Sequence, residues 1–117
     1  MVAGIAIGGL AVQGLHAQAK PSVYTVAEIT VTNMDAYMKE YVPQVQAYNK
    51  TSGGKLLAAS VKVTPLTGSA PQRVAINIWP SLDALQAARS SADFKKLRAI
   101  GEKYATFHEY AVEDLAQ

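Results

Sequence analysis

Cysteine is absent from the 117 residues of the chain, and histidine occurs only twice, as His16 and His108. Disulfide bonds and thiol nucleophiles are therefore excluded, and a zinc site would need both histidines together with carboxylates. The chain also lacks a histidine pair at ligand spacing, an acidic metal-binding loop, a glycine-rich phosphate loop after a strand pattern and a Gly-x-Ser-x-Gly elbow. We therefore expect neither a metal nor a cofactor.

Charge is sparse as well. Charged residues make up 17% of the chain, and the 11 basic and 9 acidic residues are scattered rather than clustered. This distribution argues against binding to nucleic acid. Hydrophobic residues make up 50%, as in an ordinary globular domain. A chain this short buries only about two-thirds of its unfolded surface, which leaves little room for a large pocket within one protomer. We therefore expect a homodimer, with a cavity shared between protomers.

The first nineteen residues, MVAGIAIGGLAVQGLHAQA, contain no charged side chain. Residues 1–12 form an apolar run, and Ala17-Gln18-Ala19 matches the cleavage site of a secretory signal peptide. We expect cleavage after Ala19, export to the periplasm or the medium, and a single domain over residues 20–117. Because no basic residue precedes the run, we expect translation to start upstream of Met1. The run is too short to cross a hydrocarbon core of roughly 30 Å, and a retained segment that tethers the domain to a membrane or mediates assembly is the alternative.

Residue patterns after Ala19 predict four strands and three helices. Alternating β-branched residues predict strands over 23–31, 55–66, 72–79 and 105–115. Apolar spacing predicts a helix over 34–51, capped by Thr32 or Asn33 and kinked or split near Tyr41 by Pro43. Gly53-Gly54 ends it. Ser81 and Ser91 can each cap a further helix, over 82–89 and 92–104.

This order is the ferredoxin-like βαββαβ arrangement, an α+β fold with a four-stranded antiparallel sheet. Both crossovers lie on one face of the sheet, and the serine pair at 90–91 splits the second crossover into two short helices. The other face has no cover from its own chain. Two such sheets packed face to face would form a dimeric α/β barrel.

The chain resembles the family of domain of unknown function 1330, within the dimeric α/β-barrel superfamily. The resemblance rests on motifs in a fixed order along nearly all of residues 20–117: Tyr37 and Tyr41, Gly53-Gly54-Lys55, Leu66-Thr67-Gly68, Arg73-Val74, Trp79-Pro80-Ser81-Leu82-Asp83-Ala84, Ser91-Ala92-Asp93-Phe94 and Leu97-Arg98. Three positions depart from the family pattern: Ile78 replaces a usual Glu, Ala88-Arg89 a usual aromatic pair, and Ser60-Val61 a frequent Gly-Gly. Any ligand pocket that the family shares is expected to be altered at these positions.

Two residues are candidates for catalysis. His108 is the only residue of 20–117 whose unperturbed pKa lies near neutrality, so it is the candidate general base, although a lone histidine in a terminal strand is more often structural or exposed. It shares a strand face with Thr106, Tyr110 and Val112. Tyr41 lies beside the break at Pro43, where a phenolic hydroxyl can take a polar role. Glu28 would be a proton acceptor if its face lines a cavity, and an edge salt bridge otherwise.

The candidates for ligand binding are Tyr37, Tyr41, Trp79 and Arg73. Tyrosines of the first helix, Tyr48 included, offer an aromatic body with a polar tip, while core packing is the simpler interpretation for each. Arg73 and Arg98 can hold a carboxylate through a forked hydrogen bond, unless they are solvated surface charges. Trp79 is otherwise a core or dimer anchor.

Three hypotheses for function follow. The leading one is an exported homodimer that binds a small apolar or weakly acidic molecule. The second, by analogy with the superfamily alone, is a cofactor-independent oxygenase or isomerase that transfers protons through His108 or Tyr41. In the third, a retained N-terminal segment tethers the domain to a membrane or drives assembly.

Overall fold

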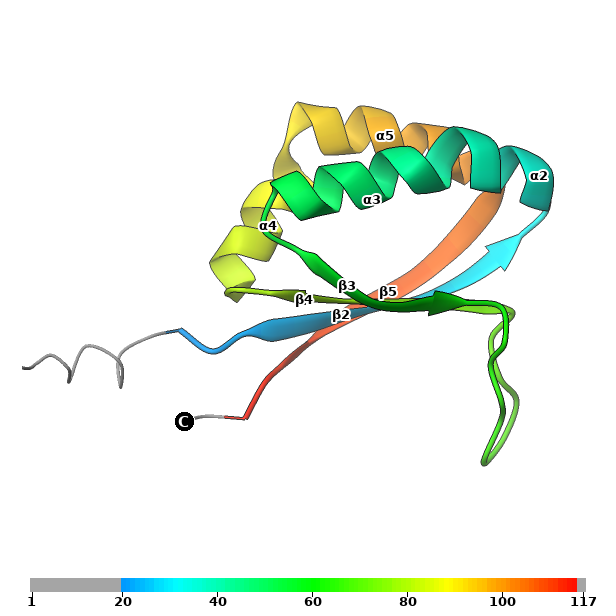
Figure 1. Ribbon diagram of the computed structural model, residues 1–117, viewed down its shortest axis with the longest axis horizontal. Coiled ribbons are helices and arrows are strands. Elements are labelled where there is room, and N and C mark those ends of the chain that lie inside the picture. The colour runs from blue at the N-terminus through cyan, green and yellow to red at the C-terminus, as the bar shows by residue number, and fades with distance from the viewer. Residues whose placement is uncertain (1–19, 116–117) are drawn as a thin grey trace, which may run out of the picture.

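The computed structural model describes residues 20–115, shown in colour in Figure 1. The predicted signal segment, residues 1–19, lies outside the described residues. The elements follow the chain as β2 (Val23–Val31), α2 (Met34–Ala36), η1 (Tyr37–Tyr41), α3 (Val42–Thr51), β3 (Lys55–Ser60), β4 (Arg73–Trp79), α4 (Leu82–Ser90), α5 (Ala92–Glu102) and β5 (Ala105–Glu113). No helix within residues 20–115 is long and apolar enough to cross a membrane.

The four strands form one antiparallel sheet in the order β3-β4-β2-β5. This is the predicted ferredoxin-like order, and the α+β fold is confirmed. Figure 1 shows the helices together on one face of the sheet, with none on the other. We call these the inner face and the open face.

Strand β2 shows which side chains belong to each face. Val23, Thr25, Ala27 and Ile29 are buried, whereas the residues between them, including Glu28, are only half-buried. Because successive side chains of a strand point to opposite sides, the buried set defines the inner face under the helices. The predicted alternation of this strand is confirmed.

The first crossover is interrupted as predicted, and the interruption is a π-helical turn. Asn33 caps α2 by accepting a hydrogen bond from the Ala36 amide at 3.2 Å. The wider turn η1 follows, closed by a bond from the Val42 amide to the Tyr37 carbonyl, and α3 resumes with Pro43 in its first turn. Proline has no amide hydrogen, so it is tolerated where a new helix begins but not inside a continuous one.

The second crossover is split at Ser91, whose hydroxyl makes three contacts. It accepts a hydrogen bond from the Phe94 amide at 3.0 Å and so caps α5, and it donates to the Ala88 carbonyl at 3.1 Å at the end of α4. The Tyr48 hydroxyl lies 2.5 Å from it and donates to the same carbonyl at 2.7 Å. The serine therefore ends one helix, starts the next and ties both to α3.

The hairpin between β3 and β4 differs from the prediction. The predicted strand 55–66 ends at Ser60, after an irregularity between Leu56 and Ala58, and β4 begins at Arg73. Residues 61–72 form an irregular extension, which we call the arm. It contains Pro65 and Pro71, which cannot donate to a ladder, and Gly68, whose φ of 74° reverses the chain. The β-branched residues of 61–63 suggested a strand, but no neighbouring strand of the described chain pairs with them.

Candidate functional site

A small cavity of about 60 Å³ lies between the inner face and helices η1, α3, α4 and α5. Its floor is a row of short side chains that crosses three strands, because Ala59 pairs with Ala75 and Ala75 pairs with Ala27. Methyl groups leave open space that longer side chains would fill. Glu109 pairs with Ala27 and continues the row into β5. This cavity is formed by a single chain, whereas the sequence suggested a cavity shared between protomers.

Tyr37 and Tyr41 project from η1 into the cavity wall. They are 2% and 1% exposed, their ring centroids lie 5.4 Å apart, and both rings pack on Phe107. Tyr41 also lies against Gly101 of α5, where an added Cβ would come within 2.8 Å of its ring. Burial raises the pKa of Tyr37 to about 12 and also raises the pKa of Tyr41. Both phenols therefore stay protonated at neutral pH and act as hydrogen-bonding groups rather than bases.

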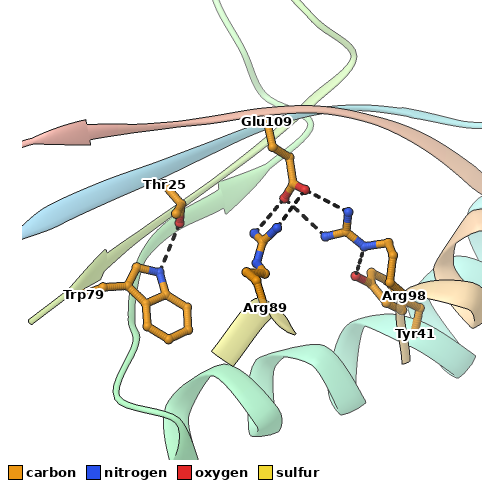
Figure 2. A network of polar contacts seen from close by, with 6 residues as sticks. All are labelled: Thr25, Tyr41, Trp79, Arg89, Arg98 and Glu109. Carbon is orange, nitrogen blue, oxygen red and sulfur yellow. Dashed lines mark hydrogen bonds and ion pairs between the residues drawn. The ribbon is translucent and has the colours of Figure 1, made fainter. Parts of the chain in front are cut away.

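Glu109 bridges two arginines at the cavity wall (Figure 2). Arg98 donates two hydrogen bonds to it, at 2.7 and 3.2 Å, and Arg89 donates two more, at 3.0 and 2.9 Å. Arg98 Nε also donates to the Tyr41 hydroxyl at 3.0 Å. Burial alone would raise the pKa of Glu109, but the hydrogen bonds from Arg98 and Arg89 outweigh it and hold this pKa below its ordinary value. The carboxylate is thus kept ionised.

Aromatic rings hold the two guanidinium groups in place. Arg98 lies 4.0 Å from the ring centroid of Phe107 and 5.0 Å from that of Phe94, and Arg89 lies 4.7 Å from Phe94. Such cation–π contacts stabilise a charge that has lost part of its water. The fork that Arg98 makes on Glu109 is the carboxylate geometry considered for this arginine from the sequence.

Arg73 lines the same cavity and is 7% exposed. Among residues 20–115, no carboxylate forms an ion pair with it, and its Nε has no hydrogen-bond partner. Its guanidinium lies 5.8 Å from the ring centroid of Tyr37. The cavity lining therefore holds three guanidinium groups, those of Arg73, Arg89 and Arg98, against the single carboxylate of Glu109.

The cavity adjoins an outer pocket of about 440 Å³ between α3 and β3. The two share Gln46, Leu56 and Asn77 in their walls. Lys50 and Lys55 line the outer pocket, and no acidic residue does. The outer pocket thus has cations but no acidic residue in its lining, and Leu56 is the apolar side chain at its junction with the cavity.

Trp79 and Tyr48 lie next to the cavity but belong to the packing around it. Trp79 is 1% exposed, donates from Nε1 to the Thr25 hydroxyl at 3.2 Å (Figure 2), and is not part of the cavity lining. It packs so closely on Gly54 that an added Cβ there would lie 2.8 Å from the indole. Tyr48 is the tyrosine tied to Ser91. Both residues hold elements together at the end of the sheet away from Arg73.

His108 lies on the open face, on the other side of the sheet from the cavity. Its side chain is 76% exposed, and its Nδ1 lies 3.4 Å from Glu28 Oε1. The Tyr110 hydroxyl donates to the other oxygen of Glu28 at 2.9 Å. Of the two candidate catalytic residues, only Tyr41 lines the cavity, and the sheet separates it from His108. Of the four candidate ligand-binding residues, the structure brings Tyr37, Tyr41 and Arg73 together.

Sequence reasoning missed Glu109 and the role of Arg89. Alternation in the last strand places Glu109 on the face opposite His108, with Phe107, so a carboxylate among inner-face residues was the available signal. Arg89 appeared only as a departure from an aromatic pair. Within residues 20–115, no group of three or more acidic or histidine side chains could hold a metal ion.

The four-stranded antiparallel sheet and the helices on one of its faces define a ferredoxin-like α+β fold. The family model of a domain of unknown function (DUF1330) matches residues 22–115, and the chain belongs to this family. No match was found among curated proteins.

Two solved structures show the same fold at low sequence identity. One is SnoaB, a cofactor-independent oxygenase from Streptomyces nogalater, with 15% identity, a TM-score of 0.62, and coverage of 83% of this chain and 96% of that one. The other is RPA0582, a protein of unknown function from Rhodopseudomonas palustris, with 11% identity, a TM-score of 0.62, and coverage of 92% and 95%. At these identities the likeness establishes the fold.

Proposed function

We propose that the protein is an exported homodimer that binds a small carboxylic acid with an apolar body in the cavity of each protomer. The observation that carries the proposal is Arg73, a guanidinium that is 7% exposed, lines the cavity, and has no carboxylate partner among residues 20–115. Removing a charge from water is costly unless an opposite charge or hydrogen bonds replace the water. A ligand carboxylate would supply both.

Electrostatics favour an anion along the whole path to this arginine. The cavity and outer pocket carry Lys50 and three arginines against one carboxylate, and that carboxylate is already bridged by Arg89 and Arg98. A cleft of one sign of charge concentrates ligands of the other sign and raises their association rate.

The volumes of the cavity and the outer pocket indicate where the head and the body of such a ligand would bind. The inner cavity of about 60 Å³ has room for a few water-sized groups, which suits a carboxylate head. The outer pocket of about 440 Å³, with Leu56 at the junction, suits an apolar body. Tyr37 and Tyr41 stay protonated, so they can donate hydrogen bonds to the head.

Self-association is the second part of the proposal. The open face carries Val26, Val74, Ile76 and Ile78 on adjacent strands, with no covering element from residues 20–115. A sheet with one uncovered apolar face is stabilised when a second layer packs on it. Structural neighbours of the dimeric α/β-barrel type support the same arrangement. Export rests on the signal-like sequence of residues 1–19.

Proton-transfer catalysis is not part of the proposal. His108 lies across the sheet from the cavity, and the one carboxylate in the cavity wall is held in its ionised form by four hydrogen bonds. A carboxylate with a lowered pKa is a weak base at neutral pH. The cavity residues are therefore better suited to binding than to abstracting a proton.

The test is titration of the full chain with hexanoate and with hexan-1-ol, followed by two-dimensional NMR. We expect hexanoate to shift cavity resonances in the wild type, and we expect Arg73→Met to abolish the shifts. Lys103→Met, which removes an exposed lysine at the end of α5, is the matched control and should bind as the wild type does. Equal binding by Arg73→Met, or equal binding of the alcohol, would refute a carboxylate site. Sedimentation velocity tests the dimer separately.

A further inference from the structure

We propose that the arm, residues 61–72, embraces a second copy of this chain seated on the open face, with Leu66 buried against that copy. The inference rests on the proposed dimer and specifies which segment outside the sheet completes its interface. Figure 1 shows the arm leaving the sheet on the side away from the helices. It therefore projects beyond the same face that lacks a cover.

The arm is longer than its connection requires. Antiparallel neighbours such as β3 and β4 are commonly joined by two to five residues. Here twelve residues connect Ser60 to Arg73. Nine of these twelve residues are exposed and none is buried. The arm therefore packs very little against the rest of residues 20–115.

The base of the arm is nevertheless held in place. The Gln72 side chain accepts a hydrogen bond from the Val31 amide at 2.6 Å, and the Ser60 hydroxyl accepts one from the Lys62 amide at 2.9 Å. Pro65 and Pro71 restrict the backbone between these points. A restricted arm loses less conformational entropy when it docks, which favours binding.

Both the arm and the open face expose apolar side chains. Leu66 is 95% exposed and Val61 is 51% exposed, and on the face itself Tyr110 and Val112 are 43% and 51% exposed. A single exposed leucine is ordinary, but one on a segment that projects beyond an uncovered apolar sheet face adds to the apolar surface that a second copy could bury. Burying such a side chain contributes about 2 kcal/mol.

The sheet alone offers a modest area for a dimer interface. Four strands of 9, 6, 7 and 9 residues, at about 3.3 Å per residue and about 4.8 Å between strands, give a flat footprint of roughly 500 Å². A standard interface buries about 800 Å² on each partner. In a two-fold dimer each copy contributes its arm to the other, so the two arms can supply the difference.

The charges of the open face and the arm are also compatible with a second copy of the chain. The open face carries Glu28, His108 and Lys55, of which Glu28 and His108 lie 3.4 Å apart, and the arm adds Lys62. The surface has no excess of one sign large enough to repel its own copy. A strongly acidic or basic partner would find no complementary field here.

The test uses sedimentation equilibrium of the full chain, with Leu66→Ser as the arm variant. Met38→Ser, which changes a residue of similar size that is 41% exposed on η1, on the helix side, is the control. We expect Leu66→Ser to weaken dimerisation at least about tenfold and Met38→Ser to leave it unchanged. Circular dichroism checks that both variants keep the fold.

Because the chain has no cysteine, Leu66→Cys provides a unique site for a nitroxide label. Mixed dimers of labelled chain with ¹⁵N-enriched unlabelled chain should show broadened resonances on the partner's open face. Dimerisation that survives Leu66→Ser, with no broadening between chains, would overturn the arm proposal and leave the dimer intact. A wild-type chain that is monomeric at roughly 100 μM would overturn both.

Discussion

The two faces of the sheet each carry a glutamate that accepts hydrogen bonds, yet the surroundings of the two carboxylates differ. Glu109, on the inner face, has an 18% exposed side chain and receives four bonds from two arginines. Glu28, on the open face, has a 35% exposed side chain and contacts Tyr110 and an exposed His108. Burial alone would raise the pKa of Glu109, but the hydrogen bonds from Arg98 and Arg89 hold it below its ordinary value. Residue type alone therefore does not predict the environment of a carboxylate. The elements packed above each strand determine its exposure and its hydrogen-bond partners.

The largest expected effect comes from removing the inner charge. Glu109→Gln leaves two partly buried guanidinium groups without their counter-charge, and we expect a loss of about 3 kcal/mol in the free energy of unfolding. Glu28→Gln is the matched change on the open face and should cost no more than about 0.5 kcal/mol. Urea denaturation at one protein concentration measures both. Similar losses for the two variants would show that the faces do not differ as described.

The pH dependence of stability should report the charge of Glu109. The folded-state pKa of Glu109 lies below its ordinary value of 4.5, so its contribution is present above that value and is lost as the pH falls through the folded pKa. We expect the melting temperature of the wild type to fall more steeply below pH 4.5 than that of Glu109→Gln. Parallel curves between pH 3 and 7 would contradict a shifted Glu109.

A smaller loss is expected from Gly101→Ala. The new methyl group would lie 2.8 Å from the ring of Tyr41, and overpacking costs about 1–3 kcal/mol, from which about 1 kcal/mol of helix propensity is recovered. We expect a net loss of about 1 kcal/mol. Ala99→Gly, at an exposed position of the same helix, calibrates the propensity contribution. A stabilised Gly101→Ala would mean that Tyr41 can shift without cost.

Arg73→Met, unlike the preceding variants, should stabilise the protein. Replacing a buried cation that has no carboxylate partner among residues 20–115 by an apolar side chain of similar length is expected to raise the free energy of unfolding by about 1 kcal/mol in the absence of ligand. Calorimetry of the unliganded chain measures it. The variant that no longer binds hexanoate would then be the more stable one, whereas a loss of stability would show that Arg73 already has adequate partners.

The smallest effect is expected on the open face. His108→Ala removes a 76% exposed side chain with one weak contact, so unfolding should change by less than about 0.5 kcal/mol. Hexanoate titration of the same variant should give the wild-type affinity, since the sheet separates His108 from the cavity. A lost affinity would restore this histidine as a candidate functional residue.

Local signals were sufficient for most of the fold. Alternation predicted β2, Pro43 predicted the break in the first crossover, and Ser91 predicted the split in the second, because each acts through backbone geometry or hydrogen bonds within a few residues. The antiparallel pairing of β3 with β4 was confirmed, but the predicted strand 55–66 was too long, because the β-branched residues after Ser60 resemble a strand and find no partner. A segment with high strand propensity forms a strand only where a neighbouring strand pairs with it.

The candidate site was harder to predict from the sequence than the fold was. Its floor depends on Ala59, Ala75 and Ala27 coming into register from three strands, which no local pattern reveals. The bridge from Arg89 to Glu109 spans twenty residues and joins a helix end to a strand. Arg73 could be named as a carboxylate ligand, but its burial depends on Tyr37 and the crossover above it.

The π-turn η1 has an evolutionary consequence. A π-turn contains one residue more than the α-helical turn it replaces, so a single-codon insertion or deletion can create or remove it. Removing one residue between Tyr37 and Tyr41 would rotate the chain before it by about 100° relative to α3. The lineage could thus exchange which side chain faces Phe107 while both flanking helices and the sheet persist. An insertion or deletion of one residue, as well as a substitution, can therefore change which ligand this fold prefers.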